Sequence, residues 1–138
     1  MKLWSGVLLF LMAAGGAVAA DLQVEVRGIQ GTEGNIRLAL YENPKTFRKE
    51  EHSRLQQSQP AQAGTLTFRI EGLAPGRYAL IVYHDADSSG TLNRFLGMIP
   101  TEGYGLSNNP QLSGPPAFND AAFDVSDSGL DTIIELRY

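Results

Sequence analysis

The sequence contains no cysteine among its 138 residues, so neither a disulfide nor a catalytic thiol is available. Small secreted domains often rely on disulfides, and this chain must instead gain its stability from packing or from a bound metal. The only tryptophan is Trp4, which leaves no tryptophan platform for a sugar further along. Eleven Lys and Arg stand against fifteen Asp and Glu, for a net charge of -4. With no cation cluster able to follow a phosphate backbone, nucleic acid is disfavoured as a partner.

The first twenty residues have the pattern of a secretory signal peptide. Lys2 gives a positive start, residues 3–14 are mostly apolar but short for a bilayer span, and residues 17–20 are small. We expect cleavage before Ala20 or Asp21, a periplasmic or secreted location in a bacterium, and no membrane span in the mature chain. The alternative is a retained membrane anchor, which the small residues favour less. Residues 21–138 then form a single domain, a usual size for one core.

Alternating apolar and polar residues predict most of a set of six β-strands. Period two occurs at residues 22–26, 36–40, 65–71, 121–125 and 134–138, where Ile134, Leu136 and Tyr138 are expected to face inward. Residues 78–83 are nearly all apolar, as in a central strand covered on both faces. The glycines of residues 28–34 suggest that the first two strands form a hairpin.

The remaining segments predict one helix and two loops. Asn43 followed by Pro44 favours a short surface helix over residues 45–51. Residues 53–64 are rich in Gln, Ser, Pro and Gly and predict a solvated loop, and residues 97–119 predict a long Gly/Pro-rich loop. The fold class is therefore all-β, an antiparallel β-sandwich of the prealbumin or immunoglobulin-like Greek-key type.

The segment after the central strand has oxygen ligands at the spacing of a calcium loop. Counted from Asp85, side-chain oxygens fall at positions one, three, five and nine, with Gly90 at six and a backbone carbonyl at seven. Position twelve is Leu96 instead of glutamate, so a carboxylate from elsewhere is needed. A weak structural Ca²⁺ site is predicted, and the alternative is an Asx-rich turn that bonds its own amides. The expected ligands are Asp85, Asp87, Ser89, Thr91, Asn93 and Glu102.

His84 begins this segment and suggests a second interpretation. Together with Asp87 or Glu102 it offers the parts for acid–base hydrolysis. No nucleophile motif accompanies it, and a histidine at a strand end is more often a packed or capping residue. We therefore assign no catalytic residue and keep a periplasmic hydrolase as the alternative function.

Aromatic residues border or lie in the Gly/Pro-rich loop. They could form a ligand surface, apolar at its centre and polar at its rim. The alternative, which we favour, is that they are the small core of the loop itself. The predicted ligand surface consists of Tyr83, His84, Phe95, Tyr104 and Phe118.

Two resemblances support the sandwich. The turn Leu73-Ala74-Pro75-Gly76 before Tyr78 resembles prealbumin-like and collagen-adhesin B-type domains. More specifically, the chain is similar to a bacterial exported family, domain-of-unknown-function family 2141, across residues 22–138. The matching motifs are His84-Asp85 with Gly90, residues 95–97, 100–105, 107–109 and 114–118, and Ala121-Ala122-Phe123. The resemblance implies a signal peptide, a small β-sandwich and no established activity, and the loop after His84 is less charged than is common in the family.

These observations favour an exported, non-enzymatic β-sandwich that binds a cell-envelope protein or a small ligand. Ca²⁺ would join the loop after His84 to the Gly/Pro-rich loop and stabilise the folded state. A simpler version is an accessory domain that binds another envelope protein only, through an exposed strand edge. Each version makes no use of nucleic acid or of a cofactor other than Ca²⁺.

Overall fold

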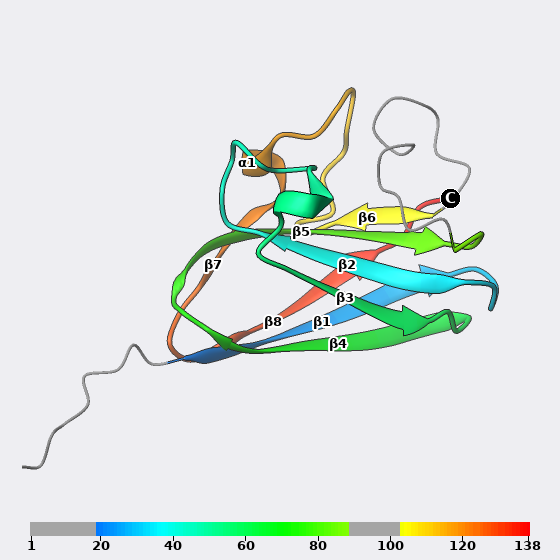
Figure 1. The fold of residues 1–138 in the computed structure, drawn as a ribbon, viewed down its shortest axis with the longest axis horizontal. Coiled ribbons are helices and arrows are strands. Elements are labelled where there is room, and N and C mark those ends of the chain that lie inside the picture. Colours follow the sequence, from blue (N-terminus) through cyan, green and yellow to red (C-terminus); the bar gives the residue numbers. More distant parts are fainter. Residues whose placement is uncertain (1–18, 89–102) are drawn as a thin grey trace, which may run out of the picture.

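The computed structural model describes residues 19–88 and 103–138 and consists of two packed β-sheets (Figure 1). One sheet has the order β4 (Gly64–Leu73), β1 (Ala20–Ile29), β8 (Leu130–Glu135). The other has the order β3 (Leu55–Pro60), β2 (Asn35–Tyr41), β5 (Gly76–Asp85), β6 (Tyr104–Leu106), and β7 (Ala122–Val125) also pairs with β5. The two helices of the described part are short: the 3-10 helix η1 (Glu50–His52) and α1 (Phe118–Ala121). The predicted all-β sandwich is confirmed.

The main core lies between the two sheets and follows the period-two pattern. Alternate residues of β1, β2, β4 and β5 are buried there because side chains of a strand point to opposite faces in turn. Burying each large aliphatic or aromatic side chain contributes about 1.5–3 kcal/mol, so this cluster dominates the stability of the fold. Its largest fully buried members are Leu22, Ile36, Leu38, Leu40, Phe68, Ile70, Leu73, Leu80 and Ile134.

A second cluster covers the outer face of the five-stranded sheet. The odd-numbered residues of β2 and β5 that point away from the main core meet α1, β6 and the connection between β2 and β3. Figure 1 shows α1 and the connection that contains η1 above β2 and β5, on the side opposite the three-stranded sheet, while β6 lies beside β5 in the sheet. β5 is therefore buried on both faces, as predicted from its apolar sequence. The members of this outer cluster are Ala39, Tyr41, Phe47, Ala79, Ile81, Tyr83, Leu106, Phe118 and Ala121.

Three features of the strand pairing differ from the predictions. β1 and β2 do not form a hairpin: β1 pairs with β4 and β8, and β2 pairs with β3 and β5, so residues 28–34 carry the chain from one sheet to the other. β8 lies parallel to β1, whereas every other pair of strands is antiparallel. Residues 55–60, predicted as loop, form β3 at the edge of the larger sheet.

Two local predictions are also wrong. Residues 44–48 form turns and only residues 50–52 are helical, so the helix expected over residues 45–51 is absent. Asn43 does cap this segment, since its side-chain oxygen accepts a hydrogen bond from the Lys45 amide at 2.9 Å. Tyr138 was expected to face inward but is 46% exposed, because the last regular strand ends at Glu135.

Side-chain amides occupy parts of both edges of the three-stranded sheet. The Gln57 and Gln59 amides donate to the carbonyls of Arg69 and Thr67 on β4, at 3.1 and 2.8 Å. At the other edge, the Asn109 side chain donates to the Ile133 carbonyl and accepts from the Glu135 amide, at 3.0 and 2.9 Å. The Asn109 side chain thus makes the two hydrogen bonds with β8 that the backbone of a neighbouring strand residue would make.

Along the described residues, no helix has both the length and the apolar character needed to cross a membrane.

Candidate functional site

The predicted calcium ligands lie at the end of β5 and in the segment after it. Asp85 is 1% exposed, and Asp87 follows it in a turn in which the Ser88 amide donates to the Asp85 carbonyl at 3.3 Å. Within residues 19–88 and 103–138, no three His, Cys, Asp or Glu side chains are grouped to hold a metal ion. The other four expected ligands, Ser89, Thr91, Asn93 and Glu102, lie outside the described residues. The calcium site therefore stays a prediction.

His84 is 3% exposed, and structural partners bond both of its ring nitrogens. Nε2 lies 2.7 Å from the Glu33 carbonyl, which only accepts, so Nε2 carries the proton. The Tyr138 hydroxyl lies 2.7 Å from Nδ1 and accepts a hydrogen bond from the Gln30 amide at 2.9 Å. His84 thus ties the end of β5 to the connection between β1 and β2 and to Tyr138, the last residue of the sequence. Both ring nitrogens are thus engaged in contacts within the fold.

The predicted ligand surface is divided between the outer cluster and residues outside the described part. Tyr83 and Phe118 are buried in the outer cluster, and Tyr104 packs half-buried against it. Phe95 lies outside the described residues. The three described aromatics therefore have the positions that the small-core interpretation expects.

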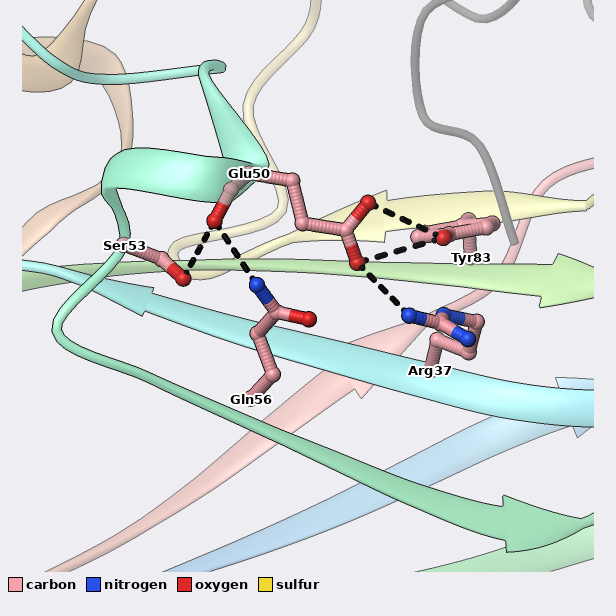
Figure 2. Close-up of polar contacts among 5 residues, drawn as sticks. All are labelled: Arg37, Glu50, Ser53, Gln56 and Tyr83. Carbon is pink, nitrogen blue, oxygen red and sulfur yellow. Dashed lines mark hydrogen bonds and ion pairs between the residues drawn. The ribbon is translucent and has the colours of Figure 1, made fainter.

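A buried ion pair fixes the connection between β2 and β3 on the sheet (Figure 2). Arg37 and Tyr83 are register partners on β2 and β5, and both contact Glu50 of η1. The Glu50 carboxylate lies 3.3 Å from Arg37 Nη2 and accepts from the Tyr83 hydroxyl at 3.2 Å. The Glu50 backbone carbonyl accepts from Ser53 Oγ and Gln56 Nε2, at 2.7 and 2.8 Å. Residues 50–56 are thereby held as one unit against β2 and β5.

Two buried atoms of this region have no hydrogen-bond partner within residues 19–88 and 103–138: the Arg37 Nε and the Tyr41 hydroxyl. Burial, and then the negative charge of Glu50, raise the pKa of both Tyr41 and Tyr83 well above the ordinary value for a phenol. Burial lowers the pKa of Arg37, but Tyr83, Glu50 and Asp85 raise it by more. The cluster therefore holds its two tyrosines neutral and its arginine charged.

The two tyrosines predict a loss of stability at alkaline pH. An unfolded tyrosine loses its proton near pH 10, while Tyr41 and Tyr83 keep theirs in the folded state, so the unfolded state binds fewer protons above pH 10. The unfolding free energy should fall by about 1.4 kcal/mol per pH unit for each such tyrosine. Urea unfolding between pH 9 and 11.5 measures this slope. In Tyr41→Phe the decrease of the unfolding free energy with pH should be smaller by the contribution of one tyrosine. An unchanged slope would contradict a raised pKa for Tyr41.

A groove opens beside this unit, between residues 44–49 and residues 115–119, with a volume of about 470 Å³. Phe47 forms its base: the Phe47 ring meets the rings of Tyr41 and Phe118 edge to face, with centroids 5.3 and 5.9 Å apart. These contacts join the two walls of the groove to the outer cluster. The lining residues are Pro44, Lys45, Phe47, Arg48, Lys49, Pro115, Pro116, Ala117, Phe118 and Asn119. We call this feature the cationic groove.

Three cations and no carboxylate line the cationic groove. Lys45, Arg48 and Lys49 form no ion pair with any described residue, whereas Arg27, Arg37, Arg54 and Arg69 each pair with a carboxylate. Arg48 has a φ of 75°, a left-handed conformation that is uncommon for a residue with a side chain. Such strain persists only where surrounding contacts impose it, and here Phe47 and Glu50 fix the chain on either side.

A comparison with protein-family models gives one match, to the family described as "Uncharacterized protein conserved in bacteria (DUF2141)", over residues 24–133. The chain belongs to this family. The match runs from the middle of β1 to β8 and so includes both sheets and the cationic groove. No curated protein and no solved structure gave a significant match. The family description states no activity, so the function of this member must be argued from its residues.

The sequence interpretation of this family member missed the cationic groove. Three cations within residues 45–49 are visible in the sequence, but a helix there would place them on a solvated surface. The second wall, residues 115–119, was predicted as part of a long loop, and its Phe118 was assigned to a ligand surface with Tyr83, His84, Phe95 and Tyr104 instead of with Phe47. The two walls are joined by the contact between Phe47 and Phe118, each of which lies close to prolines or cations in the sequence. No local sequence pattern predicts this contact.

Proposed function

We propose that this chain is an exported, non-enzymatic binding module of the bacterial cell envelope and that the cationic groove is its binding surface. One observation carries the proposal: three cations without ion-pair partners among the described residues line one wall of a groove that also has apolar lining residues. Its volume of about 470 Å³ falls within the usual range for sites of small ligands. The occupant is a small ligand or an exposed segment of an envelope protein.

Three further points support a binding role. The cluster around Glu50 and the aromatic contacts of Phe47 hold the walls in place, so a ligand meets a preformed surface. The only other histidine, His52, lies in η1 and does not line the groove. The groove itself has cations and an amide but no carboxylate, histidine or hydroxyl to move a proton or attack a substrate.

Site-specific photo-cross-linking in cells tests this proposal. A benzoylphenylalanine at Ala117, which lines the groove and is exposed, should give a discrete adduct with an envelope component. The matched control places the same group at Glu71, an exposed residue of β4 on the other sheet. Intact-mass analysis detects either a small-molecule or a protein adduct. Equal adducts at both positions, or none at Ala117, would remove the groove as the binding surface.

Ca²⁺ remains part of the proposal as a structural ion held by Asp85, Asp87 and residues of the segment that follows. An ion that binds only the folded state stabilises it by about 1.4 kcal/mol when free Ca²⁺ is ten times its dissociation constant. Millimolar Ca²⁺ should therefore raise the melting temperature, and a chelator should reverse the rise. Terbium should also luminesce through Tyr83 or Tyr104 and be displaced by Ca²⁺. The Asp87→Asn variant should reduce both effects, and their absence in the unaltered protein would refute the site.

Burial of Ala20 supports one of the two cleavage positions expected for the signal peptide. Ala20 is 3% exposed, pairs with Leu73 and belongs to the main core. Cleavage before Asp21 would remove this contact, while cleavage before Ala20 keeps it and places Ala17 and Ala19 at the positions that signal peptidases read. Intact mass of protein isolated from the periplasm should give Ala20 as the first residue. An amino terminus at Asp21, or an uncleaved chain, would contradict this prediction.

A further inference from the structure

The charge of the cationic groove runs against the charge of the whole chain. The full sequence has a net charge of -4, yet Lys45, Arg48 and Lys49 bring three of its eleven basic residues to one groove. Lys45 and Lys49 are exposed and Arg48 is half-buried. A ligand with a negative group would meet all three cations without displacing an internal ion pair among the described residues. The polar half of the groove is therefore complementary to an anion.

Most of the other lining residues of the groove are apolar. Phe47, Pro116 and Phe118 are buried and form a wall of rings, and Pro44 and Pro115 extend it toward solvent. Rings of this kind stack on planar apolar groups and offer no hydrogen bond to a sugar or a peptide backbone. This wall favours an aromatic or short acyl body attached to the anionic group.

Asn119 supplies a neutral polar contact at the rim. Its side-chain oxygen accepts a hydrogen bond from Arg77 Nη2 at 3.3 Å, which leaves the two N–H donors of the amide for another acceptor. An oxygen of a carboxylate or phosphate is such an acceptor. The donors that line the groove therefore come from both walls: ammonium and guanidinium groups from residues 45–49 and an amide from Asn119.

We infer that the cationic groove binds a small organic anion, with the carboxylate or phosphate at Lys45, Arg48 and Lys49 and a planar apolar body on Phe47, Pro116 and Phe118. This inference rests on the proposed function and names the class of ligand. Contacts between exposed charges are weak and salt-sensitive, so the anion alone binds poorly and the apolar body adds the remaining affinity. The bound molecule is either a free metabolite or the anionic end of a larger envelope component.

Titration with phenyl phosphate tests both halves of the groove, because inorganic phosphate and phenol supply each half alone. In ¹⁵N NMR spectra of the mature protein, phenyl phosphate should shift signals of residues 44–49 and 115–119. Its dissociation constant should be at least tenfold lower than that of inorganic phosphate or of phenol, and it should rise with NaCl. Benzoate in place of phenyl phosphate distinguishes a carboxylate from a phosphate ligand, and a carboxyl-terminal peptide ending in phenylalanine tests the end of a larger molecule.

Three variants locate the site. Lys45→Gln/Lys49→Gln and, separately, Arg48→Asn, which suits the left-handed backbone at this position, should each weaken phenyl phosphate binding at least tenfold. The control is Arg27→Gln. Arg27 pairs with Glu25, and both lie on β1 in the three-stranded sheet, away from the groove, so this variant should bind phenyl phosphate as the unaltered protein does. Circular dichroism and melting temperature confirm that each variant is folded.

Two results would overturn the inference. One is equal binding of phenyl phosphate by the unaltered protein and the Lys45→Gln/Lys49→Gln variant. The other is the absence of shifts at the groove with phenyl phosphate, benzoate and the peptide at millimolar concentration. If the cross-link at Ala117 still forms in either case, the proposed function stands and only the anionic ligand class fails. If the cross-link is lost as well, both fail.

Discussion

Gly34→Ala is expected to destabilise the fold by more than about 3 kcal/mol, the range of substitutions that force a backbone shift. Gly34 has a φ of +68°, and a Cβ atom there would lie 1.9 Å from the Asp85 carbonyl oxygen and 2.8 Å from two backbone atoms of Ala86. The left-handed conformation alone costs an alanine about 1–2 kcal/mol. The clash adds to this cost because the obstacles are backbone atoms of a buried strand end, which a change of side-chain rotamer cannot relieve.

The matched control for this substitution is Gly31→Ala in the same connection. Gly31 also has a positive φ, of +90°, but a Cβ there would meet nothing within 4 Å. It should therefore cost only the conformational part, about 1–2 kcal/mol. Urea unfolding of the two variants separates the clash from the conformational cost. Similar losses in both would mean that β2 and the end of β5 do not approach as closely as described.

Glu50→Leu is expected to cost about 2–4 kcal/mol, because it leaves the Arg37 charge without its partner at a largely buried position. The Glu50 and Arg37 side chains are only 11% and 26% exposed, so water replaces the lost contacts poorly. Tyr83 also loses the acceptor of its hydroxyl. Because residues 50–56 are tied to the sheet through Glu50, the walls of the cationic groove should loosen as well. Urea unfolding measures the stability, and the phenyl phosphate titration measures the groove.

A double variant and a neighbouring residue make this prediction specific. Arg37→Met/Glu50→Leu removes both charges, so it should be more stable than Glu50→Leu alone, because an apolar pair replaces a buried ion pair at little cost. Glu51→Gln, the exposed neighbour of Glu50, should change stability by less than about 0.5 kcal/mol. A double variant no more stable than Glu50→Leu would show that the pairing of Arg37 with Glu50 is not the main contribution.

The strands of the main core were predictable because burial there follows period two. Leu22, Val24 and Val26 are all buried in β1, and the apolar run of β5 is covered on both faces. The pattern reports which face of a strand is buried and does not report its partner. For this reason the predictions of a β1–β2 hairpin and of a wholly antiparallel arrangement were wrong. The pairing of strands depends on contacts between residues that are distant in the sequence.

β3 and the turn before it were mispredicted for different physical reasons. In β3 only Leu55 is a large apolar residue, and an edge strand needs few, so its sequence resembles a polar loop. Residues 45–51 have helical signals, but a helix of two turns has little stability of its own. The contacts of Phe47 and Glu50 with the sheet instead impose tight turns, with Arg48 left-handed between them.

The candidate site could be predicted only in part. The aromatics near the Gly/Pro-rich loop were interpreted either as a ligand surface or as a small core of the loop, and Tyr83 and Phe118 are buried in the outer cluster. The contact of Glu50 with Tyr83 joins residues 33 positions apart, and that of Phe47 with Phe118 crosses two loops. No spacing in the sequence encodes such contacts, so the groove between the loops became visible only in three dimensions.

The amides of Gln57, Gln59 and Asn109 along the three-stranded sheet bear on self-association at high concentration. An unpaired strand edge is a template on which a second chain adds in register and begins a fibril. On β4 and β8 an incoming strand must first displace hydrogen bonds that these side chains already make. A side-chain amide has no backbone groups to offer to a further strand. These side chains therefore block parts of the sheet edge without creating a new edge to which another strand could bond. A chain without disulfides thereby gains protection from aggregation by means of three neutral residues.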